Sequence, residues 1–171
     1  MKINLKPQRY YKDIYSINYD LLLEENRKHL IFDLDNTIAD SRFKYPDEKA
    51  IKFFAELHKK GFTTTIISNA LPGRAKRFAN SLNSDVYYLS RKPHKANYKK
   101  YLAKHSINPK LVVAIGDQIY TDIKGANRMS IHSILVDRIS KYESILTKPN
   151  RIREKYFIYK KGIIKRGDYY E

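Results

Sequence analysis

Two aspartates, spaced two residues apart at the end of an apolar run, are the side chains in this sequence best suited to chemistry. Asp33 and Asp35 close the segment 29–35, whose other residues are mostly those of a buried strand. Side chains two positions apart in a strand point to the same face, so we expect these carboxylates to converge. Two carboxylates at one place repel each other unless a cation or a shared proton lies between them. The pair therefore indicates a divalent metal ion, with one aspartate left to attack a substrate or to transfer protons.

Polar side chains also follow two other predicted strands. Ser68 and Asn69 come after the β-branched segment 62–67, and Asp117 comes shortly after the apolar segment 111–115. Neighbouring parallel strands lie about 4.8 Å apart, and open α/β sheets bind ligands at the carboxyl ends of their strands. The sequence therefore predicts that these groups gather into one site with the aspartate pair.

Predicted strands alternate with predicted helices along the chain. The strands are expected at residues 29–34, 62–67, 86–89, 111–115 and 131–136. The helices are expected at residues 7–17, 19–26, 47–60, 72–82, 95–105 and 119–129. Such alternation is typical of a parallel sheet with helices on both faces. We therefore expect an α/β fold with three layers, α/β/α, around a mainly parallel sheet of about five strands.

In this order, the polar groups resemble the four sequence motifs of haloacid dehalogenase-type (HAD) phosphatases. The four stretches are Asp33-Leu34-Asp35-Asn36-Thr37, Ser68-Asn69, Arg91-Lys92-Pro93, and Gly116-Asp117-Gln118 with Thr121-Asp122. The last two resemble subclass IIIA members, which lack a cap domain. The sequence is most similar to the YqeG family, whose relatives include phosphatidylglycerophosphate phosphatases. The resemblance extends over residues 27–137 and implies a Rossmann-like HAD fold.

The resemblance implies a role for each of these side chains. Asp33 would be the nucleophile that forms an aspartyl-phosphate, and Asp35 would protonate the leaving oxygen and then activate water. Asp117 would hold Mg²⁺ together with Asp33 and the backbone carbonyl of Asp35, because Mg²⁺ prefers hard oxygen ligands.

The phosphate group would be bound by Ser68, Asn69 and Lys92. Lys95 is a second candidate for the phosphate-binding lysine, although the Arg-Lys-Pro pattern favours Lys92. Asp122 would orient Lys92 or a metal-bound water, or would only place a favourable charge in the first turn of a helix.

The intervals between the motifs are too short to hold a cap domain. We therefore expect a capless fold whose site stays open to large or surface-bound substrates. A single HAD-like domain is expected, with a catalytic core at 29–137, a helical extension at 1–28 and a basic extension at 138–171.

Composition limits the partners. The 171 residues carry a formal net charge of +16 and no cysteine. The charge favours an anionic partner, although it also fits a protein whose many lysines serve only to keep it soluble. The lack of cysteine excludes disulfides, thiolate metal sites and cysteine nucleophiles. No apolar run is long enough for a transmembrane segment, and the N-terminus does not resemble a secretory signal. We expect a cytoplasmic protein, with or without peripheral contact to a membrane.

Residues 148–166 are rich in lysine and arginine. If this segment is helical, one face carries Ile152, Tyr156, Tyr159 and Ile163. Such an element would lie on an anionic membrane surface, pack against the core, or fold as a hairpin. Nothing in the sequence sets the oligomeric state.

We expect a Mg²⁺-dependent phosphomonoesterase that acts on phosphatidylglycerophosphate or a similar anionic substrate. One alternative is a phosphatase of nucleic-acid ends or other phosphorylated macromolecules, although no nucleic-acid-binding motif is present. Another is a non-enzymatic partner in RNA or ribosome metabolism.

Overall fold

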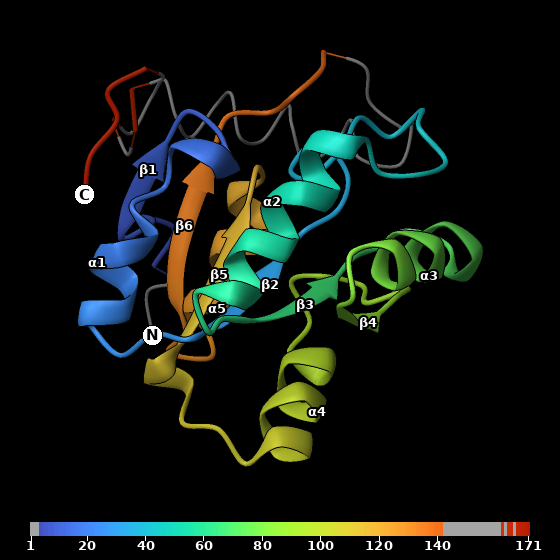
Figure 1. Cartoon of the computed structure of the whole chain (residues 1–171). Coiled ribbons are helices and arrows are strands. Elements are labelled where there is room, and N and C mark those ends of the chain that lie inside the picture. The colour runs from blue at the N-terminus through green and yellow to red at the C-terminus, as the bar shows by residue number, and fades with distance from the viewer. Residues whose placement is uncertain (1–3, 142–161, 163, 166) are drawn as a thin grey trace.

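Six parallel strands form the central sheet. The computed structural model describes residues 4–141, 162, 164, 165 and 167–171, and it orders the strands β1-β6-β5-β2-β3-β4 (Figure 1). The strands are β1 (Arg9–Tyr11), β2 (His29–Phe32), β3 (Thr63–Ile67), β4 (Asp85–Tyr87), β5 (Val112–Gly116) and β6 (His132–Val136). From β2 the chain winds outward to β3 and β4, and then returns to β5 and β6 on the other side. The strand order therefore reverses between β2 and β5, the kind of place where open α/β sheets bind ligands.

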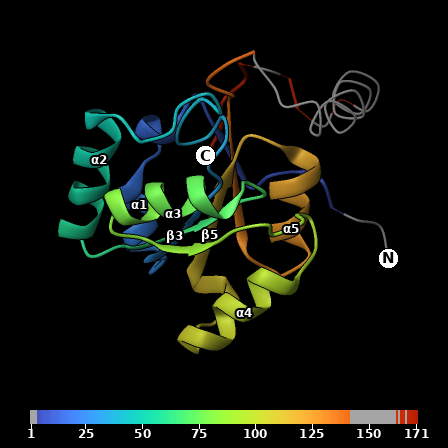
Figure 2. The same cartoon turned by 90° about the vertical axis from the view of Figure 1, so that its right-hand side faces the viewer.

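Helices cover both faces of the sheet. They are α1 (Tyr19–Glu24), α2 (Glu48–Lys59), α3 (Pro72–Ser81), α4 (Ala96–His105) and α5 (Lys124–Asn127). Figure 2 shows α2 on one side of the sheet and α5 on the other. These layers confirm the predicted α/β/α architecture.

The buried side chains of the described residues form three clusters, two of which lie against opposite faces of β2. Alternate residues of β2 point to opposite faces, so Leu30 and Phe32 pack with Phe54 of α2 and Phe78 of α3. Ile31, between them, belongs to a second core that includes tyrosines of α4. This alternation fixes β2 between the two helical layers and sets the direction in which Asp33, the next residue, leaves the sheet.

Local signals set the helix starts. The Asp47 carboxylate accepts a hydrogen bond from the backbone N–H of Ala50 at 2.7 Å and so caps α2. Pro72 occupies the first turn of α3, where its missing N–H costs nothing. Shorter helical turns are 3₁₀ helices at Ile14–Ser16 and Pro109–Leu111 and a π-helical turn at Ile119–Ile123.

The prediction of a helix at residues 7–17 is wrong. Arg9–Tyr11 is strand β1, which pairs in parallel with β6, and Asp13 caps the 3₁₀ helix that follows. All three strand residues are buried, so they show neither the period of a helix nor that of a half-exposed strand. As a result the sheet has six strands rather than about five, and the segment 1–28 is not purely helical.

The predicted helix 119–129 is also shorter and less regular than expected. It consists of the π-helical turn at Ile119–Ile123 followed by α5. The hypothesis about residues 148–166 falls mostly outside the described residues. Among the described residues, no helix is both long and apolar enough to cross a lipid bilayer.

Candidate active site

A buried lysine joins two aspartates at the carboxyl end of the sheet. Lys92 Nζ donates hydrogen bonds to Asp33 Oδ1 at 2.5 Å and to Asp122 Oδ1 at 2.6 Å. The lysine side chain is 3% exposed. Burial alone would lower the pKa of Lys92, but the Asp122 and Asp33 carboxylates outweigh it and raise that pKa above its usual value. Lys92 is therefore a fixed positive charge in direct contact with the predicted nucleophile.

The backbone places each partner of this lysine. Asp33 follows β2, and its N–H donates to the carbonyl of Ile115 in β5 at 2.9 Å. The backbone N–H of Lys92 donates to Asn69 Oδ1 at 2.8 Å, so the second residue after β3 anchors the segment that carries the lysine. Lys95, the alternative, occupies the N-cap position of α4.

Gly116 allows Asp122 to reach the site. The Asp122 Oδ2 atom accepts from the N–H of Gln118 at 3.1 Å, which holds the carboxylate close to the end of β5. A Cβ atom at position 116 would lie 2.4 Å from Asp122 Cγ, which is closer than real Cβ atoms come to other atoms. Only glycine fits here while Asp122 keeps its position.

Three buried carboxylates form a group of possible metal ligands. One oxygen from each of Asp33, Asp117 and Asp122 lies within 4.8 Å of the others. Burial raises the pKa of Asp33 well above its usual value; Lys92 lowers it, whereas the neighbouring carboxylates raise it further. A divalent cation would relieve this repulsion, and a set of three carboxylate oxygens suits a hard cation such as Mg²⁺. The donor set therefore fits the predicted metal.

Asp35 turns away from this group toward helix α3. Arg74 Nη1 donates to Asp35 Oδ1, and the same guanidinium donates to the carbonyls of Asp40 at 3.1 Å and Phe43 at 2.8 Å. Burial raises the pKa of Asp35, while Arg74 and Lys92 lower it. The Asp35 side chain is 36% exposed, compared with 9% for Asp33. Asp35 is thus the carboxylate that a group approaching from solvent meets first.

A tight turn separates the two carboxylate positions from the loop that follows. Asn36 has a φ of +64°, a left-handed conformation that asparagine tolerates better than most residues. Its N–H donates to the carbonyl of Ala39 at 2.8 Å. After this turn the chain continues as the loop whose Asp40 and Phe43 carbonyls accept hydrogen bonds from Arg74.

Ser68 is buried at the end of β3. Its Oγ accepts from the N–H of Ala70 at 3.1 Å, and its backbone carbonyl accepts from the N–H of Ser90. The segments after β3 and β4 are therefore tied together beside Lys92. The structure brings every predicted site residue to the carboxyl end of the sheet.

Sequence reasoning did not include Arg74. It lies in the first turn of α3, five residues after Asn69, and an arginine in the helix that follows the polar residues after β3 is the signal that could have found it. Which aspartate it pairs with depends on how the loop 36–45 folds back, which the sequence pattern does not encode.

Comparison with known proteins finds relatives of this chain among phosphatases. Residues 89–157 match the HAD-hydrolase-like family. The chain is 32% identical over 145 residues to the probable phosphatase YqeG of Bacillus subtilis, covering 85% of this chain and 84% of that protein. It is 26% identical over 106 residues to a glyceraldehyde 3-phosphate phosphatase of Pyrococcus furiosus, covering 56% of this chain and 44% of that protein.

Solved structures share the fold at low sequence identity. An uncharacterized protein from Listeria monocytogenes superposes with a TM-score of 0.52 at 19% identity, covering 78% of this chain and 99% of that one. A hypothetical protein from Xanthomonas campestris gives a TM-score of 0.52 at 15% identity, covering 72% and 71%. These similarities bear on the fold alone.

Proposed function

Because the chain belongs to the YqeG family of HAD-superfamily phosphatases, we propose that it is a Mg²⁺-dependent phosphomonoesterase that works through an aspartyl-phosphate on Asp33. The observation that carries the proposal is the buried Lys92, held between Asp33 and Asp122 at the end of the sheet. A phosphate monoester and an aspartate nucleophile are both anionic. A fixed cation in contact with the nucleophile offsets their repulsion and stabilises charge on the transferring phosphoryl group.

In the first step an Asp33 carboxylate oxygen attacks phosphorus, and the bond from phosphorus to the leaving oxygen breaks. Asp35 donates a proton to that oxygen, so the leaving group departs as a neutral alcohol. The more exposed position of Asp35 suits this role, because the leaving group lies on the solvent side of the phosphate.

In the second step Asp35, now ionised, accepts a proton from water while the water oxygen attacks phosphorus. The bond to Asp33 breaks, inorganic phosphate is released, and both aspartates return to their starting states. Ser68 and Asn69 bind phosphoryl oxygens beside Lys92. Arg74, through its ion pair, keeps Asp35 at the edge of the site and favours its ionised form.

Mg²⁺ would be held by Asp33, Asp117 and the backbone carbonyl of Asp35, with Asp122 completing the acidic group. When bound, the ion supplies positive charge to the phosphoryl oxygens and orients them for attack. The chain's own contribution is to hold Lys92 against Asp33, because that cation favours the ionised nucleophile against burial and the neighbouring carboxylates, which raise the pKa of Asp33.

The proposed substrate is phosphatidylglycerophosphate or a similar anionic phosphate monoester. Support comes from the family resemblance, from the open site and from the net charge of +16, which attracts anions. The same charge also suits phosphorylated nucleic-acid ends, which the experiment must therefore include.

The test is Mg²⁺-dependent phosphate release from phosphatidylglycerophosphate in mixed micelles, comparing wild type with Asp33→Asn. p-Nitrophenyl phosphate and a 5′-phosphorylated oligonucleotide serve as comparison substrates. We expect release from the lipid that is lost in the variant. Release from the oligonucleotide but not from the lipid would overturn the substrate, and unchanged release by the variant would overturn the nucleophile.

A further inference from the structure

Exposed apolar side chains surround the candidate site. They come from four loops, each of which follows a strand of the sheet. The set, which we name the apolar rim, is Phe43 (60% exposed), Tyr45 (61%), Leu71 (71%), Leu89 (51%) and Ile139 (53%). Of the large apolar side chains in the described part of the chain, only Ile51 and Tyr169 are similarly exposed. Exposed apolar groups gathered at one place indicate an interaction surface.

The loops of the apolar rim are fixed to one another. The N–H of Leu89 donates to the carbonyl of Ala70 at 3.2 Å, which joins the loops after β3 and β4. The N–H of Ile139 donates to the carbonyl of Asn36 at 3.1 Å, which joins the loop after β6 to the turn beside Asp35. These side chains are therefore held outward by a bonded backbone and are not exposed merely because a loop end is loose.

Leu89 is held in an unfavourable backbone conformation. Its φ is +47°, in the left-handed region that a bulky side chain rarely adopts. Such strain persists where the surrounding structure imposes it, and it is concentrated at functional sites. A strained, half-exposed leucine at the mouth of the site lowers the stability of the fold. A partner for its side chain would explain why a leucine stands there.

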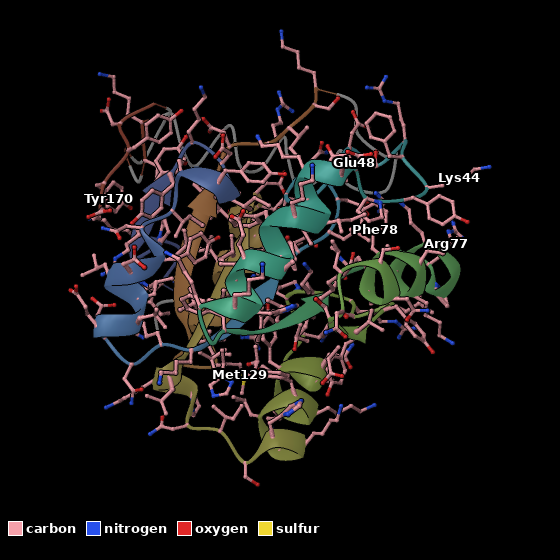
Figure 3. The ribbon with its side chains drawn as sticks, viewed as in Figure 1. Lys44, Glu48, Arg77, Phe78, Met129 and Tyr170 are labelled. Atoms are coloured by element: carbon pink, nitrogen blue, oxygen red, sulfur yellow. The ribbon has the colours of Figure 1, made fainter. Side chains whose placement is uncertain are left out.

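Basic side chains stand between the apolar ones. Lys44 lies between Phe43 and Tyr45, and Arg91 lies two residues after Leu89; both are exposed. Figure 3 shows Lys44 pointing away from the body of the protein. The rim therefore presents apolar groups and positive charge together.

Nearby acids are already engaged with other groups. Asp40 pairs with Arg42 at 2.7 Å, and the Asp47 carboxylate caps α2. The Glu48 carboxylate lies 4.0 Å from Lys52. These carboxylates keep their negative charge, so the positive charge of the rim comes from Lys44 and Arg91 and from the net charge of +16 of the chain.

We propose that the apolar rim rests on an anionic phospholipid bilayer, with its apolar side chains at the boundary between head groups and acyl chains and its basic side chains at the head groups. Apolar contact combined with attraction to anionic lipids is how proteins bind at membrane interfaces. The rim is broken into separate tips around a polar site, whereas a folded protein partner needs a continuous surface of about 800 Å². A fluid bilayer can fill the spaces between such tips.

This inference deepens the proposed function, because it brings the open site against the lipid head groups, and it rests on that function for the substrate. Membrane binding itself requires no catalysis. Asp33→Asn is therefore expected to bind vesicles as wild type does, so a failure of the chemistry and a failure of the docking are distinguishable.

The test is flotation of the full chain with vesicles made of equal parts phosphatidylglycerol and phosphatidylcholine, compared with vesicles of phosphatidylcholine alone. The triple variant Phe43→Ser, Leu71→Ser and Leu89→Ser is expected to bind the anionic vesicles at least about tenfold more weakly, because it loses three apolar groups that the proposal places in the bilayer. Its hydrolysis of p-nitrophenyl phosphate in solution is expected to stay within about twofold of wild type, since a small soluble ester needs no membrane contact.

A charge pair supplies the matched control. Lys44→Ser with Arg91→Ser removes two cations from the rim, and Lys28→Ser with Lys59→Ser removes two exposed cations from the opposite edge of the sheet. We expect the first pair to weaken anionic binding severalfold more than the second. Equal losses in the two pairs, or unchanged flotation of the triple variant, would overturn the proposal. A rim-dependent dimer in light scattering, without vesicle binding, would assign the rim to a second copy of the chain instead.

Discussion

Asp117 is the residue whose proposed role depends most directly on a bound metal ion. One oxygen from each of Asp33, Asp117 and Asp122 lies within 4.8 Å of the others, and Lys92 Nζ bonds to Asp33 and Asp122. Carboxylates this close repel one another, and a bound cation relieves that repulsion. Its energy should therefore respond to Mg²⁺ even when no substrate is present.

We expect Mg²⁺ at about one hundred times its Kd to stabilise the wild type by about 2.7 kcal/mol. The melting temperature should then rise by about 5–10 °C for a chain of this size. Asp117→Asn should lose most of that rise, whereas Asp20→Asn, which alters an exposed ion pair with Lys60, should keep it. Differential scanning calorimetry with and without Mg²⁺ measures the effect, and equal rises in both variants would contradict the assignment of Asp117.

Arg74 tunes Asp35. Its ion pair lowers the pKa of that carboxyl, against the opposing effect of burial. Removing the guanidinium in Arg74→Gln should raise the pKa of Asp35 and keep the proton on it to a higher pH. The alkaline limb of the pH profile of kcat/KM, where the general acid loses its proton, should therefore move to higher pH.

The matched control for Arg74 is Arg77→Gln. Arg77 lies on the same helix and donates to the carbonyl of Lys44 at 3.2 Å, so it supports the same loop, whereas Asp35 pairs with Arg74. Its pH profile should stay in place. If both variants shift the profile alike, the effect belongs to the loop and not to the ion pair.

At the scale of elements, the end of β5 is built around Gly116. Gly116→Ala should force Asp122 out of position, because the added Cβ would meet its carboxylate at 2.4–2.5 Å. We expect a loss of about 1–3 kcal/mol in the free energy of unfolding, together with a severe loss of activity. Gly73→Ala is the control, since its Cβ would meet only Arg77 Nη1 at 3.5 Å and should change stability by less than about 1 kcal/mol. Urea unfolding measures both, and a neutral Gly116→Ala would contradict the account.

Strand β6 begins with a histidine that makes stability depend on pH. Burial, with Arg27 and Arg9 nearby, lowers the pKa of His132 from 6.5 to about 4. As the pH falls, the imidazole of His132 therefore takes up a proton in the unfolded chain before it does so in the folded one. The stability that neutral His132 contributes to the folded chain is complete above pH 6.5 and is lost as the pH falls from about 6.5 to 4.

His132→Gln should remove that contribution. The free energy of unfolding, measured by urea titration at several pH values, should fall less steeply below pH 6.5 in the variant than in wild type. Parallel curves for the two proteins would show that His132 is protonated equally in the folded and unfolded chains.

The sequence predicts five of the six strands because each shows an apolar or β-branched run bounded by turn residues. Strand β1 is not predicted because Arg9, Tyr10 and Tyr11 are all buried, so they show no alternation of apolar and polar residues. Their burial arises only when the sheet is complete. The aspartates and Lys92 are predictable because they belong to short sequence motifs that follow predicted strands. The Arg74 pair is not, because it depends on the path of a polar loop.

At the scale of the whole molecule, the positive charge should act on substrate capture. With a net charge of +16, the electrostatic field of the protein attracts anionic esters, and added salt screens this attraction. We expect the KM for p-nitrophenyl phosphate to rise severalfold between about 0.05 and 0.5 M NaCl while kcat changes little. Steady-state kinetics at fixed pH provides the measurement; a kcat that falls while KM stays constant would place the salt effect in the chemical steps instead.

The phosphoenzyme is the most direct test of the central claim. Turnover with Mg²⁺ and substrate is quenched in acid, the protein is treated with borohydride, which reduces an aspartyl-phosphate to homoserine, and the peptides are mapped by mass spectrometry. The account predicts homoserine at position 33 alone, and none when Mg²⁺ or substrate is omitted. Homoserine at another aspartate, or none at all while phosphate is released rapidly, would contradict Asp33 as the nucleophile.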